Sequence, residues 1–323
     1  MRKQPSIVVL GGGSGISVLL RGLKHLPVDI TTIVTVADSG GSSGVLRKEF
    51  SCLPPGDFRN VIAALSDVEP LMEEVFQYRF QKDTFLGGHP LGNLIIMAMT
   101  ELTGNLQESI DSLRKLFNIK AQILPASLDN VTLAAKKIDG SIVEGENEIP
   151  RTNQKIQEVF YTTKVKPIPK TLEIIKKADL IILGMGSLYT SLIPHLLVEG
   201  ISESIAKSKA KKIYICNAME QPGETEQYTV SDHVKAIYQH SQEGLIDTIL
   251  VDSHSIPKRE MKRYEEAGVS RVEIDFPKLQ ELGLEVIDRN MIEVDKKGMI
   301  RHHPYRLAAV IYSLIDHWER FYD

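Results

Sequence analysis

Three predicted β-strands in this chain each run directly into a loop rich in glycine, hydroxyl or amide side chains. The sequences are VVLGGGSG (8–15), IILGMGSLYTS (181–191) and YICNAMEQPGET (214–225). A parallel sheet places all of its strand-to-helix loops along one carboxyl edge, which is where open α/β sheets bind ligands. The pattern therefore predicts a parallel sheet on which these three distant segments converge around a phosphorylated ligand.

The residues around the first loop have the spacing of a parallel crossover. A short apolar run at 6–10 precedes the loop, and a second strand is predicted over 30–37. Between them, apolar residues recur at helical intervals, at Ile16, Leu19, Leu20 and Leu23. A strand, a helix and a strand in this order build a right-handed crossover. We expect a single domain over residues 1–323 with a Rossmann-like, three-layer α/β/α fold and a mostly parallel sheet.

Two stretches in the middle of the chain depart from this alternation. Residues 91–102, LGNLIIMAMTEL, are apolar nearly all round and predict a central buried helix. Residues 118–165 contain short strand-like runs with Asp139-Gly140 as a hairpin turn, which predicts a small antiparallel β insertion within the domain. Helices are predicted afterwards over 188–206, 231–240, 258–267 and 305–322, the last on the outside of the sheet.

Composition limits the class of partner. The 323 residues carry a formal net charge of −4, so a basic nucleic-acid surface is not expected. No stretch approaches the roughly 20 apolar residues of a membrane span. The two cysteines, Cys52 and Cys216, lack metal-ligand spacing and favour a reducing compartment. We expect a cytoplasmic protein with a small-molecule nucleotide ligand, forming a homo-oligomer such as a dimer, with regulatory protein partners also open.

The first loop has the context of a phosphate site, with a strand before it and an amphipathic helix after it. Glycine lets the backbone approach a ligand, and helix N-terminal N–H groups favour an anion. Ile16 stands where the dinucleotide fingerprint G-x-G-x-x-G requires its last glycine, and the Gly-Lys-Ser/Thr of a Walker loop is absent. We predict that Gly11, Gly12, Gly13, Ser14 and Gly15 contact a phosphate. The alternative is that these residues form a purely structural turn.

Further polar residues follow the second strand. Asp38 ends that strand near the position of the ribose-binding acid in a dinucleotide site, and it could instead hold a cation or cap a helix. Ser42, Ser43 and Arg47 are candidate anion donors, with helix capping as the alternative for the serines. Asp57, in PPGDFRN, is more typical of a helix N-cap.

The remaining candidates come from three later loops. His89 and Asn93 precede the apolar helix, where ligand contact and a structural role are equally open. The second glycine loop contributes Gly184, Gly186, Ser187, Thr190 and Ser191. The third contributes Asn217, Glu224 and Thr225. Hydroxyls at such positions either cap the helix or bind phosphate.

A metal site and a catalytic group are less well supported by the sequence. Asp38, Asp57 and Glu224 could hold a hard ion such as Mg²⁺ if the fold brings them together. No Ser–His–Asp order, nucleophile elbow or zinc spacing occurs. Catalytic residues are therefore unassigned, and the sequence favours binding over catalysis.

Taken in order, several motifs resemble the bacterial gluconeogenesis factor family, which lies in the superfamily of 2-phospho-L-lactate transferase. The resemblance runs from residue 7 to about residue 314 and rests on GGGSG, VADSGGSSGVLR, PPGDFRN, ALSD, YRF, GHPLGN, GSLYTS and QPGET. It implies a cytoplasmic protein that binds a nucleotide-sugar, UDP-N-acetylglucosamine. It also implies a role in carbon flow toward cell-wall precursors and in cell shape during gluconeogenic growth. On this analogy the two glycine loops hold the diphosphate, and Tyr264 and Arg301 belong to the nucleotide-sugar site.

Two positions depart from the family pattern. Ser39 stands where a second acidic or amide residue usually follows Asp38, which weakens a metal-dependent transferase mechanism. Gly184-Met185-Gly186 replaces Gly-Pro-Gly, which keeps both glycines, so we expect the loop to retain its ligand function. Three functions remain open: a regulatory protein that senses a uridine nucleotide-sugar, an Mg²⁺-dependent transferase of a nucleotide-activated phospho-acid, and an NAD-binding protein.

Overall fold

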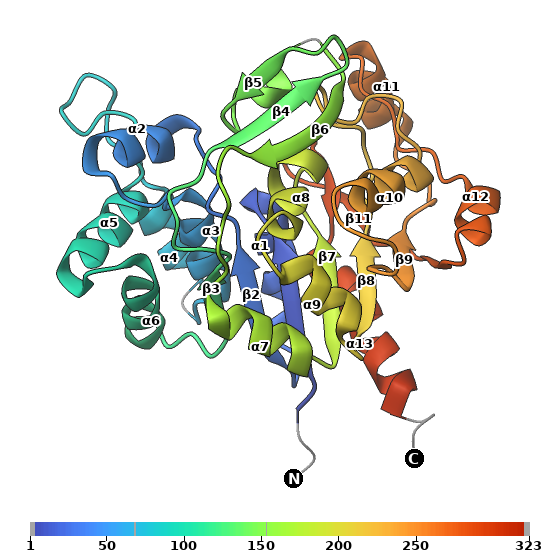
Figure 1. Cartoon of the computed structure of the whole chain (residues 1–323), viewed down its shortest axis with the longest axis horizontal. Helices are drawn as coiled ribbons and strands as arrows, with labels where there is room; N and C mark the ends of the chain where they lie inside the picture. Colours follow the sequence, from blue (N-terminus) through green and yellow to red (C-terminus); the bar gives the residue numbers. More distant parts are fainter. Residues whose placement is uncertain (1–3, 68, 153, 320–323) are drawn as a thin grey trace.

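The computed structural model describes residues 4–67, 69–152 and 154–319. Its centre is a seven-stranded sheet in the order β10-β9-β8-β7-β1-β2-β3, and the neighbouring strands all pair in parallel (Figure 1). This sheet, flanked by helices, confirms the predicted α/β fold. Its strands are β1 (Ser6–Gly11), β2 (Asp29–Val34), β3 (Gln122–Pro125), β7 (Leu180–Gly184), β8 (Lys211–Ile215), β9 (Thr248–Val251) and β10 (Glu285–Asp288).

The order of the strands places a switch point beside β1. From β1 the chain proceeds to β2 on one side, whereas β7 pairs with the other side of β1 and continues outward to β8. Strands β1 and β7 are buried along nearly their whole length, as near-continuous apolar runs in a parallel sheet require. The three glycine-bearing loops therefore follow three neighbouring strands, at the point where open α/β sheets form their ligand crevice.

Right-handed crossovers place helices on both faces of the sheet. The β1-to-β2 and β7-to-β8 connections run in opposite directions, so α1 covers one face and α8 with α9 covers the other. Helix α1 packs against α3 and α13, and α7 packs against α9. The helices are α1 (Gly13–Leu23), α2 (Gly41–Phe50), α3 (Gly56–Leu65), α4 (Glu69–Gln77), α5 (Leu91–Thr103), α6 (Leu106–Leu116), α7 (Pro169–Lys177), α8 (Ile193–Leu196), α9 (Ile201–Lys207), α10 (Val230–Gln239), α11 (Lys258–Glu266), α12 (Phe276–Glu281) and α13 (Pro304–Glu319).

Two small antiparallel sheets accompany the main sheet. The larger consists of β4 (Leu133–Lys137), β5 (Ile142–Glu144) and β6 (Ile156–Tyr161), and it lies at the top of the molecule in Figure 1. The smaller pairs β11 (Ile292–Val294) with β12 (Ile300–His302). The antiparallel strands begin later than the predicted start at residue 118. The first predicted strand of the insertion is β3, which pairs in parallel with β2, because a short apolar run does not reveal its partner.

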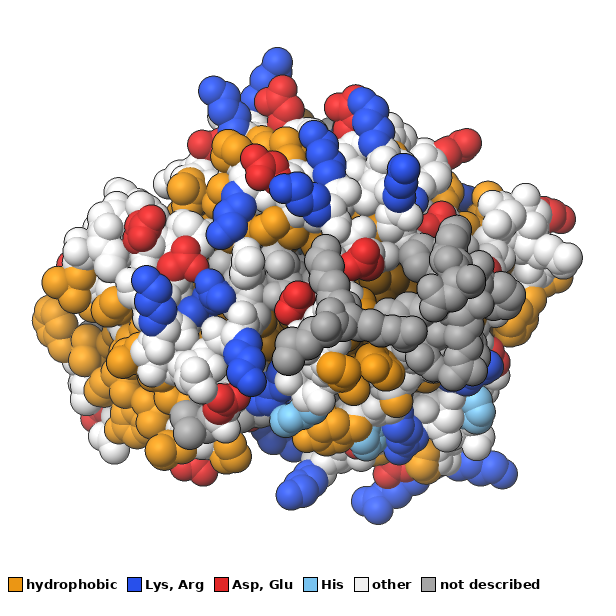
Figure 2. All heavy atoms as spheres, turned by 90° about the horizontal axis from the view of Figure 1, so that it is seen from below, with side chains coloured by type: hydrophobic (Ala, Val, Ile, Leu, Met, Phe, Trp, Pro, Cys, Tyr) orange, Lys and Arg blue, Asp and Glu red, His pale blue; other side chains and the backbone are white. Residues whose placement is uncertain are grey.

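The prediction of a central buried helix at residues 91–102 was wrong. Helix α5 packs on α4 and α6, to one side of the sheet, and only Gly92, Asn93 and Ile96 are buried in it. Leu102 is 80% exposed. Figure 2 shows hydrophobic side chains gathered on this side of the molecule. Apolar composition all round a helix therefore did not indicate burial here.

Two later helices also differ from their predicted bounds. The helix predicted over 188–206 is a turn of π-helix (Leu188–Leu192) followed by α8 and α9, with Gly200 at a positive φ of 77° between the two α-helices. The last helix, α13, packs on α1, and the predicted residues 320–322 lie outside the described part. No helix within that part is long and apolar enough to cross a membrane.

Candidate functional site

The first two glycine loops pack backbone against backbone. The N–H of Gly12 donates to the carbonyl oxygen of Met185 over 3.3 Å. A Cβ on Gly11 would lie 2.4 Å from the carbonyl oxygen of Gly184, and a Cβ on Gly15 would lie 2.6 Å from the nitrogen of Gly186. These glycines are needed so that the two loops can meet. Gly13 differs, because it has a φ of +62° and a Cβ there would meet no atom within 4 Å.

The second loop has an unusual backbone. Gly184, Met185 and Gly186 all have positive φ, of 125°, 67° and 121°. A proline ring fixes φ near −65°, so proline could not occupy position 185 in this conformation. The π-helical turn follows at once, with the N–H groups of Ser191 and Leu192 both donating to the carbonyl oxygen of Ser187. Such π-turns are frequent at functional sites.

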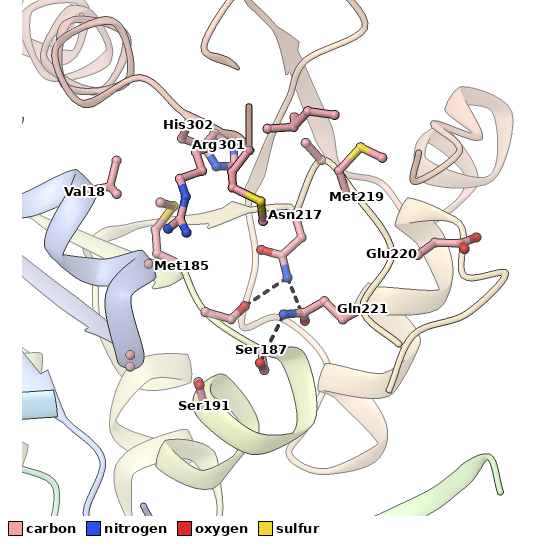
Figure 3. A pocket seen from close by; sticks show the side chains of 17 residues that line it. Val18, Met185, Ser187, Ser191, Asn217, Met219, Glu220, Gln221, Arg301 and His302 are labelled. Atoms are coloured by element: carbon pink, nitrogen blue, oxygen red, sulfur yellow. Dashed lines mark hydrogen bonds between the residues drawn. The ribbon is translucent and has the colours of Figure 1, made fainter. Parts of the chain in front are cut away.

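The third loop holds the second in place through side chains. Asn217 donates to the carbonyl oxygen of Gly186 (2.9 Å) and to Gln221 (3.0 Å), and Gln221 donates to the hydroxyl of Ser187 (3.1 Å) (Figure 3). The buried carboxylate of Glu224 accepts from the Tyr189 N–H (3.0 Å). The sequence did not single out Gln221, although it lies beside candidates in the same loop.

These loops line a cavity of about 360 Å³ at the carboxyl edge of the sheet. Strand β12 closes it from the opposite side with Arg301 and His302, and Figure 3 shows both side chains beside Met185 and Asn217. Of the predicted residues, those that line the cavity are Gly12, Gly13, Gly15, Gly186, Ser187, Ser191, Asn217 and Arg301. Backbone of the glycine loops, amide and hydroxyl side chains, and one guanidinium therefore face the same space.

Other candidates lie outside this cavity. Tyr264 accepts the N–H of Ile300 over 3.1 Å, so its hydroxyl contacts the backbone of β12. Thr190 donates to Glu224 over 2.8 Å and is buried. Ser43 accepts the N–H of Gly56, and neither Ser43 nor Ser42 caps α2. The side chain of Ser14 lies outside what the structure describes.

Ser42, His89 and Asn93 form a separate polar network next to α3. The hydroxyl of Ser42 lies 2.8 Å from Nδ1 of His89 and accepts from the Asn93 amide over 3.1 Å. Asn93 in turn accepts from Arg59 over 3.2 Å. The structure therefore brings these three predicted residues together, but their side-chain hydrogen bonds are with one another and with Arg59 of the PPGDFRN motif.

Three acidic residues gather beside the first loop. Burial and the charge of Asp38 raise the pKa of Asp57 to about 7, whereas a hydrogen bond from the Gly13 N–H opposes that shift. Burial and the charges of Asp38 and Asp57 raise the pKa of Glu146 to about 8. Asp57 is not the predicted N-cap, because Pro55 holds that position in α3. Glu146 comes from the antiparallel insertion, and nothing in its local sequence indicated this contact.

Glu224 does not join the acidic cluster as a free ligand. Its two oxygens are occupied by Thr190 and by the backbone of the π-helical turn. Asp38, Asp57 and Glu146 influence one another electrostatically. Within the described residues, however, the three side chains whose ligand atoms all lie within 4.8 Å of one another are those of Asp252, His254 and Asp288. Asp57 occupies a backbone N–H at the start of α1 that an anion would otherwise use, so a phosphate at this end of the cavity would meet negative charge unless a cation intervened.

The fold and this cavity define a Rossmann-like α/β protein with a polar site at the switch point of its sheet. Residues 7–292 match the family of 2-phospho-L-lactate transferase CofD, and the chain belongs to that family. It is 52% identical over 316 residues to the gluconeogenesis factor of Bacillus subtilis, covering 98% of this chain and 99% of that protein. The gluconeogenesis factor of Halalkalibacterium halodurans is 47% identical, with 96% of each chain covered.

A solved structure supports the fold directly. A Bacillus halodurans protein of the UPF0052 family superposes with a TM-score of 0.92 at 47% identity, covering 95% of this chain and 99% of that one. The family comparison and the relatives confirm the resemblance on which the sequence analysis relied.

Proposed function

We propose that this protein binds a nucleotide-sugar, with UDP-N-acetylglucosamine as the ligand, and regulates carbon flow toward cell-wall precursors and cell shape during gluconeogenic growth. The observation that supports binding is the cavity at the ends of β1, β7 and β8, where the glycine loops meet Arg301. The guanidinium of Arg301 is suited to a diphosphate. The N–H groups of Gly12 and Gly13 already bond Met185 and Asp57, so they do not supply this contact in the present conformation. The names of the gluconeogenesis factors above support the link to gluconeogenic growth. The roles in carbon flow to cell-wall precursors and in cell shape rest on the family resemblance alone.

Calorimetric titration tests this proposal. We expect UDP-N-acetylglucosamine to bind and Arg301→Ala to weaken it, because a charge-assisted hydrogen bond contributes roughly 1.5–3 kcal/mol, or about 10- to 150-fold in Kd. Lys258→Ala, an exposed cation at the start of α11, is the control. Binding of NAD without binding of the UDP-sugar would replace this function with the dinucleotide alternative.

The acidic cluster supports a second candidate, an Mg²⁺-dependent transferase of a nucleotide-activated phospho-acid. Asp38, Asp57 and Glu146 influence one another electrostatically near the first loop. Mg²⁺ would have to draw their carboxylates closer together, because they are not among the described groups whose ligand atoms all lie within 4.8 Å. Glu146 supplies a carboxylate in the region where Ser39 stands in place of the family's second acid or amide, since its carboxylate accepts the Ser39 N–H. Mg²⁺-dependent binding of a nucleoside diphosphate that Asp57→Asn abolishes would favour this candidate. The oligomeric state and protein partners stay predictions.

A further inference from the structure

A second cavity adjoins the first. It has a volume of about 580 Å³ and shares Val18, Arg301 and His302 with the first cavity, so these side chains are the boundary between the two. Its walls come from α1, α3, α4, the start of α13 and the hairpin of β11 and β12. No residue of the three glycine loops is in its described lining, although α1, which follows the first loop, contributes Ser17, Val18 and Arg21. Its lining contains more charged side chains than that of the first cavity. The lining residues are Ser17, Val18, Arg21, Asn60, Ala63, Glu73, Gln77, Glu293, Asp295, Lys296, Lys297, Arg301, His302 and Pro304.

One polar group in this lining is left without a partner. Ser17 is only 3% exposed, and its hydroxyl has no hydrogen bond to any residue that the structure describes. A serine inside a helix usually bonds the carbonyl one turn earlier or points to solvent. Ser17 does neither, although a buried polar group without a partner costs free energy. Because Ser17 lines the cavity, a small rotation of its side chain would let a ligand group hydrogen-bond this hydroxyl, whose accessible surface is below 1 Å² here.

The neighbouring amides also keep hydrogen-bonding capacity. Asn60 accepts from Arg59 (3.1 Å) and from Gln77 (3.0 Å) through its oxygen. The Asn60 amide nitrogen and the Gln77 oxygen have no partner within the described residues. A hydroxyl group can both donate and accept, so it suits one amide nitrogen and one amide oxygen placed side by side.

The charges in this cavity are nearly balanced. Arg21 pairs with Glu73 over 2.9 Å, and Arg301 pairs with Asp295 over 3.3 Å. Four cationic side chains stand among three carboxylates in the lining: Arg21, Lys296, Lys297 and Arg301 among Glu73, Glu293 and Asp295. Burial lowers the pKa of His302 to about 4, so its ring is neutral near pH 7. A second anion would gain little here, whereas a neutral ligand rich in hydroxyls would meet both donors and acceptors.

We propose that this second cavity is the subsite for a neutral, hydroxyl-rich group, the sugar of a nucleotide-sugar whose diphosphate lies in the first cavity. The boundary at Arg301 and His302 then marks where the sugar joins the diphosphate. Val18, Ala63 and Pro304 supply an apolar surface for the carbon–hydrogen face of the ring. This subsite rests on the proposed nucleotide-sugar function and assigns the residues that recognise the sugar.

The test compares UDP-N-acetylglucosamine with UDP by calorimetric titration of the whole protein. Ser17→Ala and Gln77→Ala should each weaken the UDP-sugar about 3- to 10-fold, the usual effect of losing one hydrogen bond, and leave UDP unchanged. Gln81→Ala, an exposed glutamine outside both cavities, is the matched control for Gln77→Ala. Thermal unfolding checks the variants, and Ser17→Ala should fold normally because its hydroxyl has no partner among the described residues.

The possible results separate the two proposals. Loss that is selective for the UDP-sugar supports the subsite. If wild-type protein binds UDP and the UDP-sugar equally, or if both variants weaken the two ligands alike, the subsite is overturned while the nucleotide site stands. If neither ligand binds, the proposed function fails, and the subsite fails with it.

Discussion

The N–H of Gly12 donates to the carbonyl oxygen of Met185, which joins two loops that are more than 170 residues apart in the sequence. This contact is possible only because Gly11 and Gly15 have no side chains to separate the two backbones. Glycine repeats after a strand are usually interpreted as room for a ligand. Here most of the repeat makes room for another part of the same chain, and Gly13 is the glycine that faces open space.

Substitution of single glycines should separate packing from ligand binding. Gly15→Ala should destabilise the fold by about 3 kcal/mol, because its Cβ would meet backbone that cannot move aside. Gly13→Ala should cost only about 1–2 kcal/mol, the strain of a left-handed conformation. Urea unfolding measures both. Equal losses of stability in the two variants would contradict the assigned roles.

A charge at Gly13 should block the cavity without unfolding the protein. Gly13→Asp adds a carboxylate to a region that already contains Asp38 and Asp57. We expect a phosphorylated ligand to be repelled and binding to be lost, while the circular dichroism spectrum stays that of the wild type. Gly13→Asn, of similar size and without charge, is the control. Unaltered affinity of Gly13→Asp for the UDP-sugar would remove the diphosphate from this loop.

Stability should fall as the pH rises across neutrality. Asp57 and Glu146 have pKa values raised from 3.8 to about 7 and from 4.5 to about 8, so the folded chain holds protons that unfolding releases. A carboxyl group whose pKa is higher in the folded than in the unfolded chain lowers the free energy of unfolding as the pH rises from its unfolded-state pKa to its folded-state pKa. We expect the unfolding temperature to decrease between about pH 5 and pH 8, and to decrease less in an Asp57→Asn, Glu146→Gln double variant.

Two controls make the pH experiment specific. Glu144→Gln changes an exposed acid on β5, near Glu146 in sequence, and should keep the wild-type slope. Mg²⁺ should flatten the slope if it binds the cluster, because a cation favours the ionised carboxylates. If the double variant shows the same decrease of unfolding temperature with pH as the wild type, the pKa values of Asp57 and Glu146 are not raised as described.

The backbone at Met185 excludes proline. Met185→Pro should cost about 3 kcal/mol or more, because φ would have to change from +67° to about −65°. Met185→Leu keeps an apolar side chain at this buried position and should cost less than about 1.5 kcal/mol. Urea unfolding of the two variants gives the comparison. A stable, ligand-binding Met185→Pro variant would mean that the loop adopts a second conformation.

Local patterns predicted the sheet and the convergence of its loops well. The apolar runs of β1 and β7 and the glycines after them define strands and loops within a few residues. Parallel geometry then brings the loop ends together without further information. For the same reason Ser187, Ser191 and Asn217 could be placed beside Gly13 from the sequence alone.

The errors share a different physical cause, which is dependence on distant partners. The strand β3 has the composition of a hairpin strand but pairs with β2, and α5 is apolar yet packs on other helices instead of the sheet. Glu146 enters the acidic cluster from a loop in the insertion whose residues carry no motif. Nothing in the sequence distinguishes Ser17 from other helical serines, whereas the structure shows that its hydroxyl has no partner in the described part of the chain.

The position of Glu146 gives the insertion a mechanical connection to the site. Its carboxylate accepts the Ser39 N–H, and the Ser39 hydroxyl accepts the N–H of Asn147, so the loop after β5 is tied to the strand end that carries Asp38. The protonation of Glu146 therefore depends on the charges of Asp38 and Asp57. A carboxylate of the insertion and the carboxylates beside the first glycine loop thus belong to one electrostatic unit, although they come from distant parts of the sequence.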